Sequence, residues 1–178
     1  SAVPADLDRR SALVTGAGRG LGQGIALAFA AAGARVLTVS RTASELEQTS
    51  ALVAAVGLPA SEVVADLTDL DGLKDLAGRL WDIHGRIDVA VQSAGRQLRK
   101  ASADVTPDEL RAMLDLTLAA PFLLSAAIGG RMIEEKVPGR HIFIGSLASR
   151  IGLPNVVPYA ATKSGIVGVV HGLSREWA

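Results

Sequence analysis

The chain has 178 residues, of which 49% are hydrophobic and 20% charged, and its 18 basic and 18 acidic side chains give a formal net charge of zero. This composition predicts one soluble globular domain over residues 1–178, and the neutral balance argues against binding to nucleic acid or acidic membranes by bulk charge. The absence of cysteine excludes disulfides, zinc–thiolate sites and thiol nucleophiles, and is consistent with a cytoplasmic location.

Membrane attachment is not expected from the apolar stretches or from the N-terminus. Gly24–Ala34 and Leu116–Gly130 are both shorter than a membrane span, and Pro121 interrupts the second. Residues 6–10 contain two aspartates and two arginines ahead of the first apolar run, unlike a signal peptide. We therefore expect neither a membrane nor a nucleic acid as a partner.

Short β-branched runs alternate with longer stretches of helical character along the whole chain. The expected strands are Ser11–Thr15, Ala34–Ser40, Glu62–Asp66, Ile87–Gln92 and His141–Ser146. The expected helices are Gly20–Ala32, Ala43–Val56, Asp69–His84, a long one from about Pro107 to Lys136, and Val157–Ala178. This alternation predicts parallel βαβ units with right-handed crossovers, and strands that are apolar on both faces indicate helices on both sides of the sheet.

The predicted fold class is therefore a doubly wound α/β domain with a Rossmann-type parallel sheet. In such folds ligands bind at the carboxyl ends of the strands, near the point where the strand order reverses. These ends follow Val14, Val39, Ala65, Val91 and Ile144.

A glycine-rich turn, Thr-Gly-Ala-Gly-Arg-Gly-Leu-Gly over residues 15–22, follows the first strand and opens the first helix. Glycines at this place permit a tight turn and a close approach of backbone to a pyrophosphate, while the helix N-terminus offers free N–H donors. Gly22 would let the helix pack closely on the sheet. The alternative is a connector that binds no ligand, which the position in the first βα unit makes less favoured.

The spacing Thr-Gly-x-x-x-Gly-x-Gly resembles the turn of the short-chain dehydrogenase/reductase family. This resemblance implies that Gly16, Gly20 and Gly22, together with Leu21, line the site of the cofactor pyrophosphate. It extends over essentially the whole chain. Members of the family usually continue well beyond the equivalent of Ala178, so the C-terminal part of the usual domain is expected to be absent here.

The end of the second strand indicates which nicotinamide cofactor is used. A ribose 2′-hydroxyl calls for an acidic acceptor at this place, whereas a 2′-phosphate calls for cationic donors. The chain has Ser40 and Arg41 here, with no carboxylate at the strand end, and Arg19 lies in the glycine turn. Basic residues at these positions resemble NADP-preferring members, so NADP(H) is the expected cofactor and NAD(H) a second one. The alternative is that both arginines are solvated surface charges.

The ends of the third and fourth strands carry further cofactor positions by the same resemblance. Asp66 is similar to the family's adenine-contacting aspartate, with Leu67 beside the adenine, although a turn aspartate is the alternative. Ala94 and Gly95 fit a backbone that passes close to the cofactor. Gln92 and Ser93 differ from the usual Asn-Asn, which leaves the usual side-chain hydrogen bonds of this strand end open.

A candidate reacting group lies at the start of the last helix. Tyr159 and Lys163 are four residues apart and therefore share a helix face. A neighbouring ammonium favours the ionised phenol that proton exchange requires. Ser146 ends the fifth predicted strand thirteen residues before Tyr159, a spacing seen in the family. The resemblance assigns Tyr159 as general acid/base, Ser146 as hydrogen-bond partner of the substrate oxygen, and Lys163 as electrostatic and ribose-binding partner.

One position of the family's usual tetrad differs. The family commonly has Asn in the long fourth helix, where this chain has Thr117. Thr can bind a water or a carbonyl but lacks the second donor of the amide. An altered water relay toward Lys163 is therefore expected.

The expected reaction is hydride transfer between NADP(H) and a carbonyl or secondary alcohol. Gly22–Ala26, Ser164-Gly165 and Glu176–Ala178 look like gluconate and deoxygluconate dehydrogenases, and the basic loop Arg96–Lys100 could meet a sugar-acid carboxylate or simply be solvated. A 3-oxoacyl thioester reductase and a non-catalytic NADP(H)-binding regulator remain alternatives.

Two further expectations concern assembly and metals. The small and apolar residues of Leu110–Ile133 and Val157–Leu173 predict a homodimer or homotetramer formed through the last helices, as in relatives, although these faces could also be intramolecular core. The three histidines, His84, His141 and His171, show no metal-ligand spacing, so no metal is expected.

Overall fold

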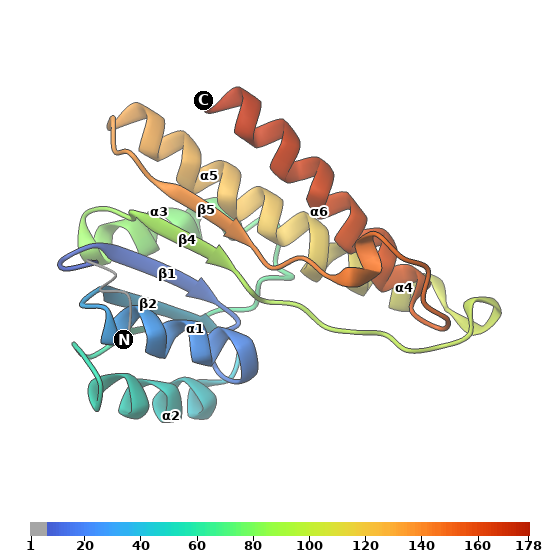
Figure 1. Cartoon of the computed structure of the whole chain (residues 1–178), viewed down its shortest axis with the longest axis horizontal. Helices are drawn as coiled ribbons and strands as arrows, with labels where there is room; N and C mark the ends of the chain where they lie inside the picture. Colours follow the sequence, from blue (N-terminus) through green and yellow to red (C-terminus); the bar gives the residue numbers. More distant parts are fainter. Residues whose placement is uncertain (1–6) are drawn as a thin grey trace.

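A computed structural model describes residues 7–178; residues 1–6, with Asp6 of the charged N-terminal segment, lie outside the described part (Figure 1). Within residues 7–178, five parallel strands form one sheet in the order β3-β2-β1-β4-β5. The strands are β1 (Ser11–Thr15), β2 (Arg35–Ser40), β3 (Ser61–Val64), β4 (Val89–Gln92) and β5 (Arg140–Phe143). The strand order reverses between β1 and β4, so the carboxyl ends of these two strands define the expected ligand crevice.

Helices cover both faces of the sheet, as predicted. α1 (Gly20–Ala31) and α2 (Ala43–Ala54) lie on one face, and α3 (Leu73–His84) and α5 (Ala120–Glu134) lie on the other (Figure 1). Successive side chains of β1 pack on opposite faces of the sheet. Leu13 belongs to the core on the α3–α5 side, and Val14 to the core on the α1–α2 side. The doubly wound fold is thereby confirmed.

The remaining helices lie beyond the carboxyl end of the sheet and along α5. α4 (Pro107–Leu114) continues into the π-helical segment Asp115–Ala119 and then into α5, and α6 (Val157–Glu176) packs against α4 and this segment. Gly165 permits the close contact, because a Cβ there would lie 3.0 Å from both δ-carbons of Leu118.

Several predicted boundaries are wrong by a few residues. β3 and β5 end early, and both show alternating burial rather than two apolar faces, because each pairs with one neighbour at a sheet edge. α3 begins at Leu73 instead of Asp69, since the Asp69 side chain accepts a hydrogen bond from the Gly72 N–H (3.3 Å) and forms a turn instead of a helix.

The prediction that the apolar stretch around Leu116–Gly130 is too short to span a membrane is wrong by length. The helix runs for 28 residues from Pro107 to Glu134, and its mean hydropathy reaches 1.7 over 18 residues. Pro121 does not end the helix, because it stands in the first turn of α5 directly after the π-helical segment. The buried side of this helix packs into the core that α3 and the sheet share, as the core helix of a globular protein does.

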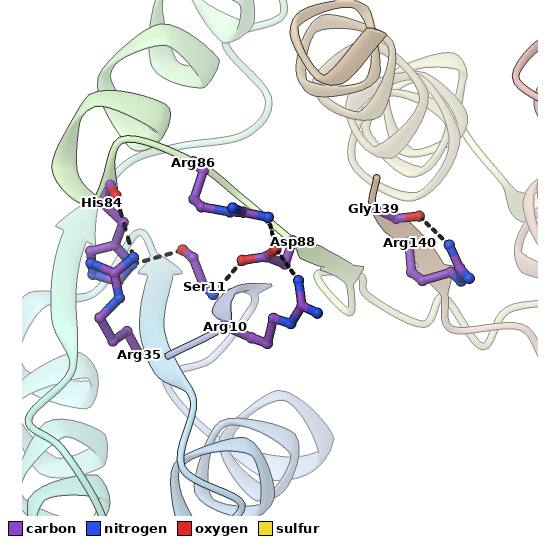
Figure 2. A network of polar contacts seen from close by, with 8 residues as sticks. All are labelled: Arg10, Ser11, Arg35, His84, Arg86, Asp88, Gly139 and Arg140. Carbon is purple, nitrogen blue, oxygen red and sulfur yellow. Dashed lines mark hydrogen bonds and ion pairs between the residues drawn. The ribbon is translucent and has the colours of Figure 1, made fainter. Parts of the chain in front are cut away.

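A buried carboxylate lies at the end of the sheet where the strands begin, which we call the amino edge. Asp88, 4% exposed, accepts hydrogen bonds from the Ser11 backbone N–H (2.8 Å), from Arg10 (3.0 Å) and from Arg86 (Figure 2). Burial alone would raise the pKa of Asp88, but the hydrogen bonds from Ser11 and the two guanidiniums outweigh it and lower that pKa. Asp88 therefore joins the beginnings of β1 and β4 as an anion.

His84, the last residue of α3, also lies at the amino edge, beside the first residues of β1 and β3. Its Nδ1 lies 2.7 Å from the Ser11 hydroxyl, and Arg35 donates to the His84 carbonyl (Figure 2). Its Nε2 lies 3.1 Å from the Ser61 hydroxyl. Burial and the neighbouring Arg35 lower the pKa of His84. His84 thus has a structural role among hydroxyls.

Candidate active site

A cavity of about 570 Å³ lies at the end of the sheet formed by the carboxyl ends of the strands, which we call the carboxyl edge. It lies near the point where the strand order reverses. Its walls come from the glycine turn and from the ends of β2, β3 and β4. The predicted cofactor positions that line it are Gly16, Arg19, Gly20, Leu21, Gly22, Ser40, Arg41, Asp66, Leu67, Ala94 and Gly95. Residues that are far apart in the sequence are therefore brought to one site by the parallel topology.

The glycine turn is built for close backbone contact. Gly16 has φ +66°, and a Cβ on it would lie 2.7 Å from the Cα of Ala94. A Cβ on Gly22 would lie 2.2 Å from the Gly16 carbonyl oxygen. At the start of α1 no side chain caps the helix, which leaves the N–H groups of its first turn free to bind an anion. The turn therefore fits a pyrophosphate.

Two polar residues that the sequence analysis did not single out hold this turn. The Thr49 hydroxyl, buried on α2, donates to the carbonyls of Ala17 (2.9 Å) and Gly18 (3.2 Å). Gln23 donates in turn to Thr49 (2.9 Å). These contacts anchor the glycine turn to α2 through two of its carbonyls. The signal that could have found Thr49 is its position between Leu46 and Val53 on the buried side of α2.

The corner of the cavity at the end of β2 combines two arginines with a carboxylate. Ser40 is half-buried, while Arg19 and Arg41 are exposed. The end of β2 carries no carboxylate, as the sequence shows, but an acidic side chain reaches this corner from another element. Glu45, from the first turn of α2, lines the same corner, and its Oε1 lies 3.6 Å from Nε of Arg19. Glu45 follows the end of β2 by five residues, so the pattern at the strand end did not predict this carboxylate.

Asp66 both lines the cavity and forms a local turn. Its Oδ1 accepts from the Thr68 N–H (2.9 Å) and hydroxyl (2.8 Å). These two hydrogen bonds, with a smaller contribution from Arg41, lower the pKa of Asp66. The carboxylate is therefore fixed and ionised, and Asp66 lines the cavity together with Leu67.

The end of β4 is held by side chains that differ from the family's usual pair. Thr15 accepts hydrogen bonds from the N–H groups of Ser93 (3.0 Å) and Ala94 (3.2 Å). Gln92 is buried, lies 3.3 Å from the Thr15 hydroxyl and donates to Ser125 (3.1 Å). The backbone path past Ala94 and Gly95 is thus fixed without the Asn side chains that the family usually has.

The candidate reacting residues lie at the same sheet edge, outside the set that lines the cavity. Lys163, 7% exposed, donates to the Ile144 carbonyl (2.6 Å), and the Ile144 N–H bonds to the end of β4 at Gln92 (3.1 Å). Its Nζ lies 5.9 Å from the ring centre of Tyr159. Burial lowers the pKa of Lys163. Lys163 and Tyr159 are thus neighbours beside the strand ends.

Ser146 lies beyond β5 rather than in it. β5 ends at Phe143, and the Ser146 oxygen accepts from the Ala148 N–H (3.1 Å), capping a short 3-10 turn, Leu147–Ser149. The predicted strand is too long here because Gly145 separates its end from the turn.

Thr117 is buried inside the π-helical segment. Its hydroxyl lies 3.6 Å from the sulfur of Met113, and a Cβ on Gly95 would lie 3.9 Å from its Cγ2. Thr117 therefore lies next to the cavity wall, while Leu116 beside it lines the cavity.

The sequence profile of the short chain dehydrogenase family matches residues 10–178. The chain belongs to this family. The predicted resemblance is confirmed.

Individual relatives match nearly all of the chain. It is 34% identical over 172 residues to a 2-dehydro-3-deoxy-D-gluconate 5-dehydrogenase of Bacillus subtilis, covering 97% of this chain and 66% of that protein. It is 33% identical to a 3-oxoacyl-(acyl-carrier-protein) reductase of Synechocystis, covering 97% and 70%. A crystal structure with bound NADP, of a Beutenbergia cavernae protein described as an NAD(P)-dependent gluconate 5-dehydrogenase, matches with a TM-score of 0.91, at 38% identity over 98% and 69%. The chain thus spans about two thirds of the length of these relatives.

Proposed function

We propose that this protein is an oxidoreductase that transfers a hydride between NADP(H) and a carbonyl or secondary alcohol. The observation that supports this most is the cavity at the carboxyl edge, whose walls combine the glycine turn after β1, three arginines and the ends of β2, β3 and β4. The donor set fits the cofactor: free N–H groups at the start of α1 for the pyrophosphate, and Ser40, Arg41 and Arg19 for a 2′-phosphate.

The chemistry divides between the cofactor and the chain. When bound, the nicotinamide supplies or accepts the hydride. Tyr159 donates the proton that a growing alkoxide requires, or removes it in the opposite direction. Ser146 orients the substrate oxygen, and the buried Lys163 ammonium, 5.9 Å from the Tyr159 ring, favours the phenolate. The Ile144 carbonyl uses one of the three donors of Lys163, which leaves two for a ribose.

We propose a sugar acid or a polyol as the substrate. Arg96 is exposed and lines the cavity directly after Gly95, so a guanidinium is available for a substrate carboxylate. The B. subtilis and B. cavernae relatives carry the names of dehydrogenases for gluconate-type substrates. A second candidate, 3-oxoacyl thioester reduction, draws on the name of the Synechocystis relative.

A panel of sugar acids, polyols and 3-oxoacyl thioesters, each assayed with both cofactors, tests this proposal. We expect turnover on a sugar acid or a polyol with NADP(H). Turnover confined to thioesters would replace the substrate class. Cofactor binding without any turnover would favour the third candidate, a non-catalytic regulator. Thr117 favours this candidate because it stands where the family usually has Asn, and its hydroxyl contacts the Met113 sulfur.

We also propose a homo-oligomer, in the cytoplasm, formed through the last helices. Large apolar side chains remain exposed along α4, α5 and α6: Leu110, Phe122, Leu123, Ile133, Val157 and Val170. Exposed apolar surface of this kind is typical of an interface. Light scattering at micromolar concentration tests this proposal, and a monomeric mass would contradict it.

A further inference from the structure

Two segments of the chain share the pattern Thr-x-x-Glu at the start of a helix, and they behave differently. At Thr106 and Glu109 the pattern forms a complete capping box: Glu109 N–H donates to the Thr106 hydroxyl (3.2 Å), and Thr106 N–H donates to Glu109 (2.8 Å). At Thr42 and Glu45 no side-chain cap forms, although α2 begins at the same place in the pattern. Glu45 is therefore not used to satisfy the helix start.

Glu45 is directed at the phosphate corner instead. Its Oε1 lies 3.6 Å from Nε of Arg19. A Cβ added to Gly18 would lie 2.8 Å from Glu45 Oε2 and 3.0 Å from the Ser40 hydroxyl, so the carboxylate and this hydroxyl border the same point. The side chain of Glu45 is only 35% exposed, whereas that of Arg19 is 85% exposed. The carboxylate is thus part of the cavity wall, and Arg19 reaches over to it.

This arrangement places an anion where a second anion is expected to bind. A 2′-phosphate held by Ser40, Arg41 and Arg19 would lie beside the Glu45 carboxylate and would have to take Arg19 from it. The 2′-phosphate and the Glu45 carboxylate would repel each other as neighbouring negative charges, and solvent would screen this repulsion only partly because Glu45 is half-buried. NAD, which has a hydroxyl at this place, meets no such repulsion.

We propose that Glu45 is a specificity-determining residue that competes with the 2′-phosphate of NADP for Arg19 and so limits the preference for NADP over NAD. This inference rests on the proposed function, because it assumes that the cavity binds a nicotinamide dinucleotide. The acidic side chain that affects the choice between NAD and NADP would then be Glu45 on α2, and not a residue at the end of β2.

The test is a pair of matched variants, Glu45→Gln and Glu47→Gln, titrated with NADPH and NADH while binding is followed by nicotinamide fluorescence. Both variants remove one negative charge from α2, but Glu47 is exposed and does not line the cavity. For Glu45→Gln we expect the ratio of the NADH and NADPH dissociation constants to rise about tenfold, which corresponds to about 1.4 kcal/mol. For Glu47→Gln we expect a change below about twofold, as for a screened surface charge.

A third arm examines the competition for Arg19. In an Arg19→Gln background, Glu45→Gln should raise NADPH affinity by less than it does in the parent, because the freed arginine is absent. If Glu45→Gln raised NADPH affinity equally with and without Arg19, the proposed competition for Arg19 would be wrong. If the ratio of the NADH and NADPH dissociation constants were the same in the Glu45 and Glu47 variants, the proposed role of Glu45 in specificity would be wrong. If the parent chain bound neither cofactor, the proposed function itself would fail, a result distinct from an unchanged ratio. Melting temperatures of the two variants show whether each is folded.

Discussion

The polar groups at the amino edge and at the carboxyl edge of the sheet have different surroundings. At the amino edge, Asp88 is buried and bound by Ser11, Arg10 and Arg86 (Figure 2), and His84 lies between the hydroxyls of Ser11 and Ser61. At the carboxyl edge, the first N–H groups of α1 have no side-chain cap, and Arg41 is exposed. The amino edge pairs its buried carboxylate and its imidazole within the chain, whereas the carboxyl edge leaves the first N–H groups of α1 and the Arg41 guanidinium available to a ligand.

This difference separates residues that stabilise the fold from residues that can serve a ligand. A buried charge that loses its partner is costly, so a substitution at the amino edge should change the free energy of unfolding. An exposed charge contributes little to stability, so a substitution at the carboxyl edge should mainly change binding or turnover. Four predictions, taken from the largest expected effect to the smallest, can break or sharpen this comparison.

Tyr159→Phe should give the largest effect, on turnover alone. The substitution keeps the ring and removes the hydroxyl that we propose as general acid/base, so turnover should fall by about 10²–10⁴-fold. Steady-state assays on the best substrate of the panel measure it. NADPH affinity and melting temperature are the controls, and both should stay near the parent values. A variant with near-parental turnover would remove Tyr159 from the proposed site.

Asp88→Ala should be the most destabilising of the four. It leaves the buried Ser11 N–H without its acceptor and removes the counter-ion of two partly exposed guanidiniums, which we expect to cost about 3 kcal/mol. Urea denaturation measures the loss. The matched control is Asp108→Ala, which removes an exposed partner of Arg111 and should cost less than about 1 kcal/mol. Equal losses would contradict the contrast between the edges.

Arg41→Asp should change cofactor preference with little change in stability. One charge-assisted hydrogen bond to a 2′-phosphate is worth about 1.5–3 kcal/mol, so the preference should shift toward NAD by about ten- to hundredfold, mainly through the cofactor's KM. Parallel titrations of parent and variant with both cofactors measure it. Arg79→Asp, at an exposed position on α3 away from the cavity, makes the same charge change and should leave the preference as it is. If the parent bound NAD at least as tightly as NADP, the proposed role of Arg19 and Arg41 would be wrong.

The fold could be predicted from the sequence because its signals are local and repeated. Strand and helix alternation gave the parallel sheet, and β1 and α6 begin at the predicted residues. What failed depends on competing local interactions: the Asp69 turn delays α3, and the segment Asp115–Ala119 becomes π-helical within an otherwise regular periodic pattern. Periodicity alone cannot show where a side chain binds its own backbone.

The candidate site was predictable only where the family resemblance or a strand end pointed to it. The glycine turn and Arg41 lie at such positions and do line the cavity. Thr49 and Glu45 do not, because both are contributed by α2, and their reach toward the turn depends on how that helix packs. A pattern in one segment could not show which partner in another segment its side chain would meet.

The smallest effect is expected from the two helix starts that share Thr-x-x-Glu. Thr106→Ala removes the hydroxyl that accepts from the Glu109 N–H (3.2 Å) and should cost about 1 kcal/mol, the usual loss for such a cap. Thr42→Ala removes a hydroxyl that caps nothing and should cost only a few tenths of a kcal/mol. Urea denaturation of both variants under the same conditions measures the difference. A loss at Thr42 as large as that at Thr106 would mean that the Thr42 hydroxyl caps α2 in solution, and would contradict the difference between the two helix starts. Because α2 lies at the carboxyl edge, a small loss at Thr42 would agree with the view that polar groups at this edge contribute little to stability.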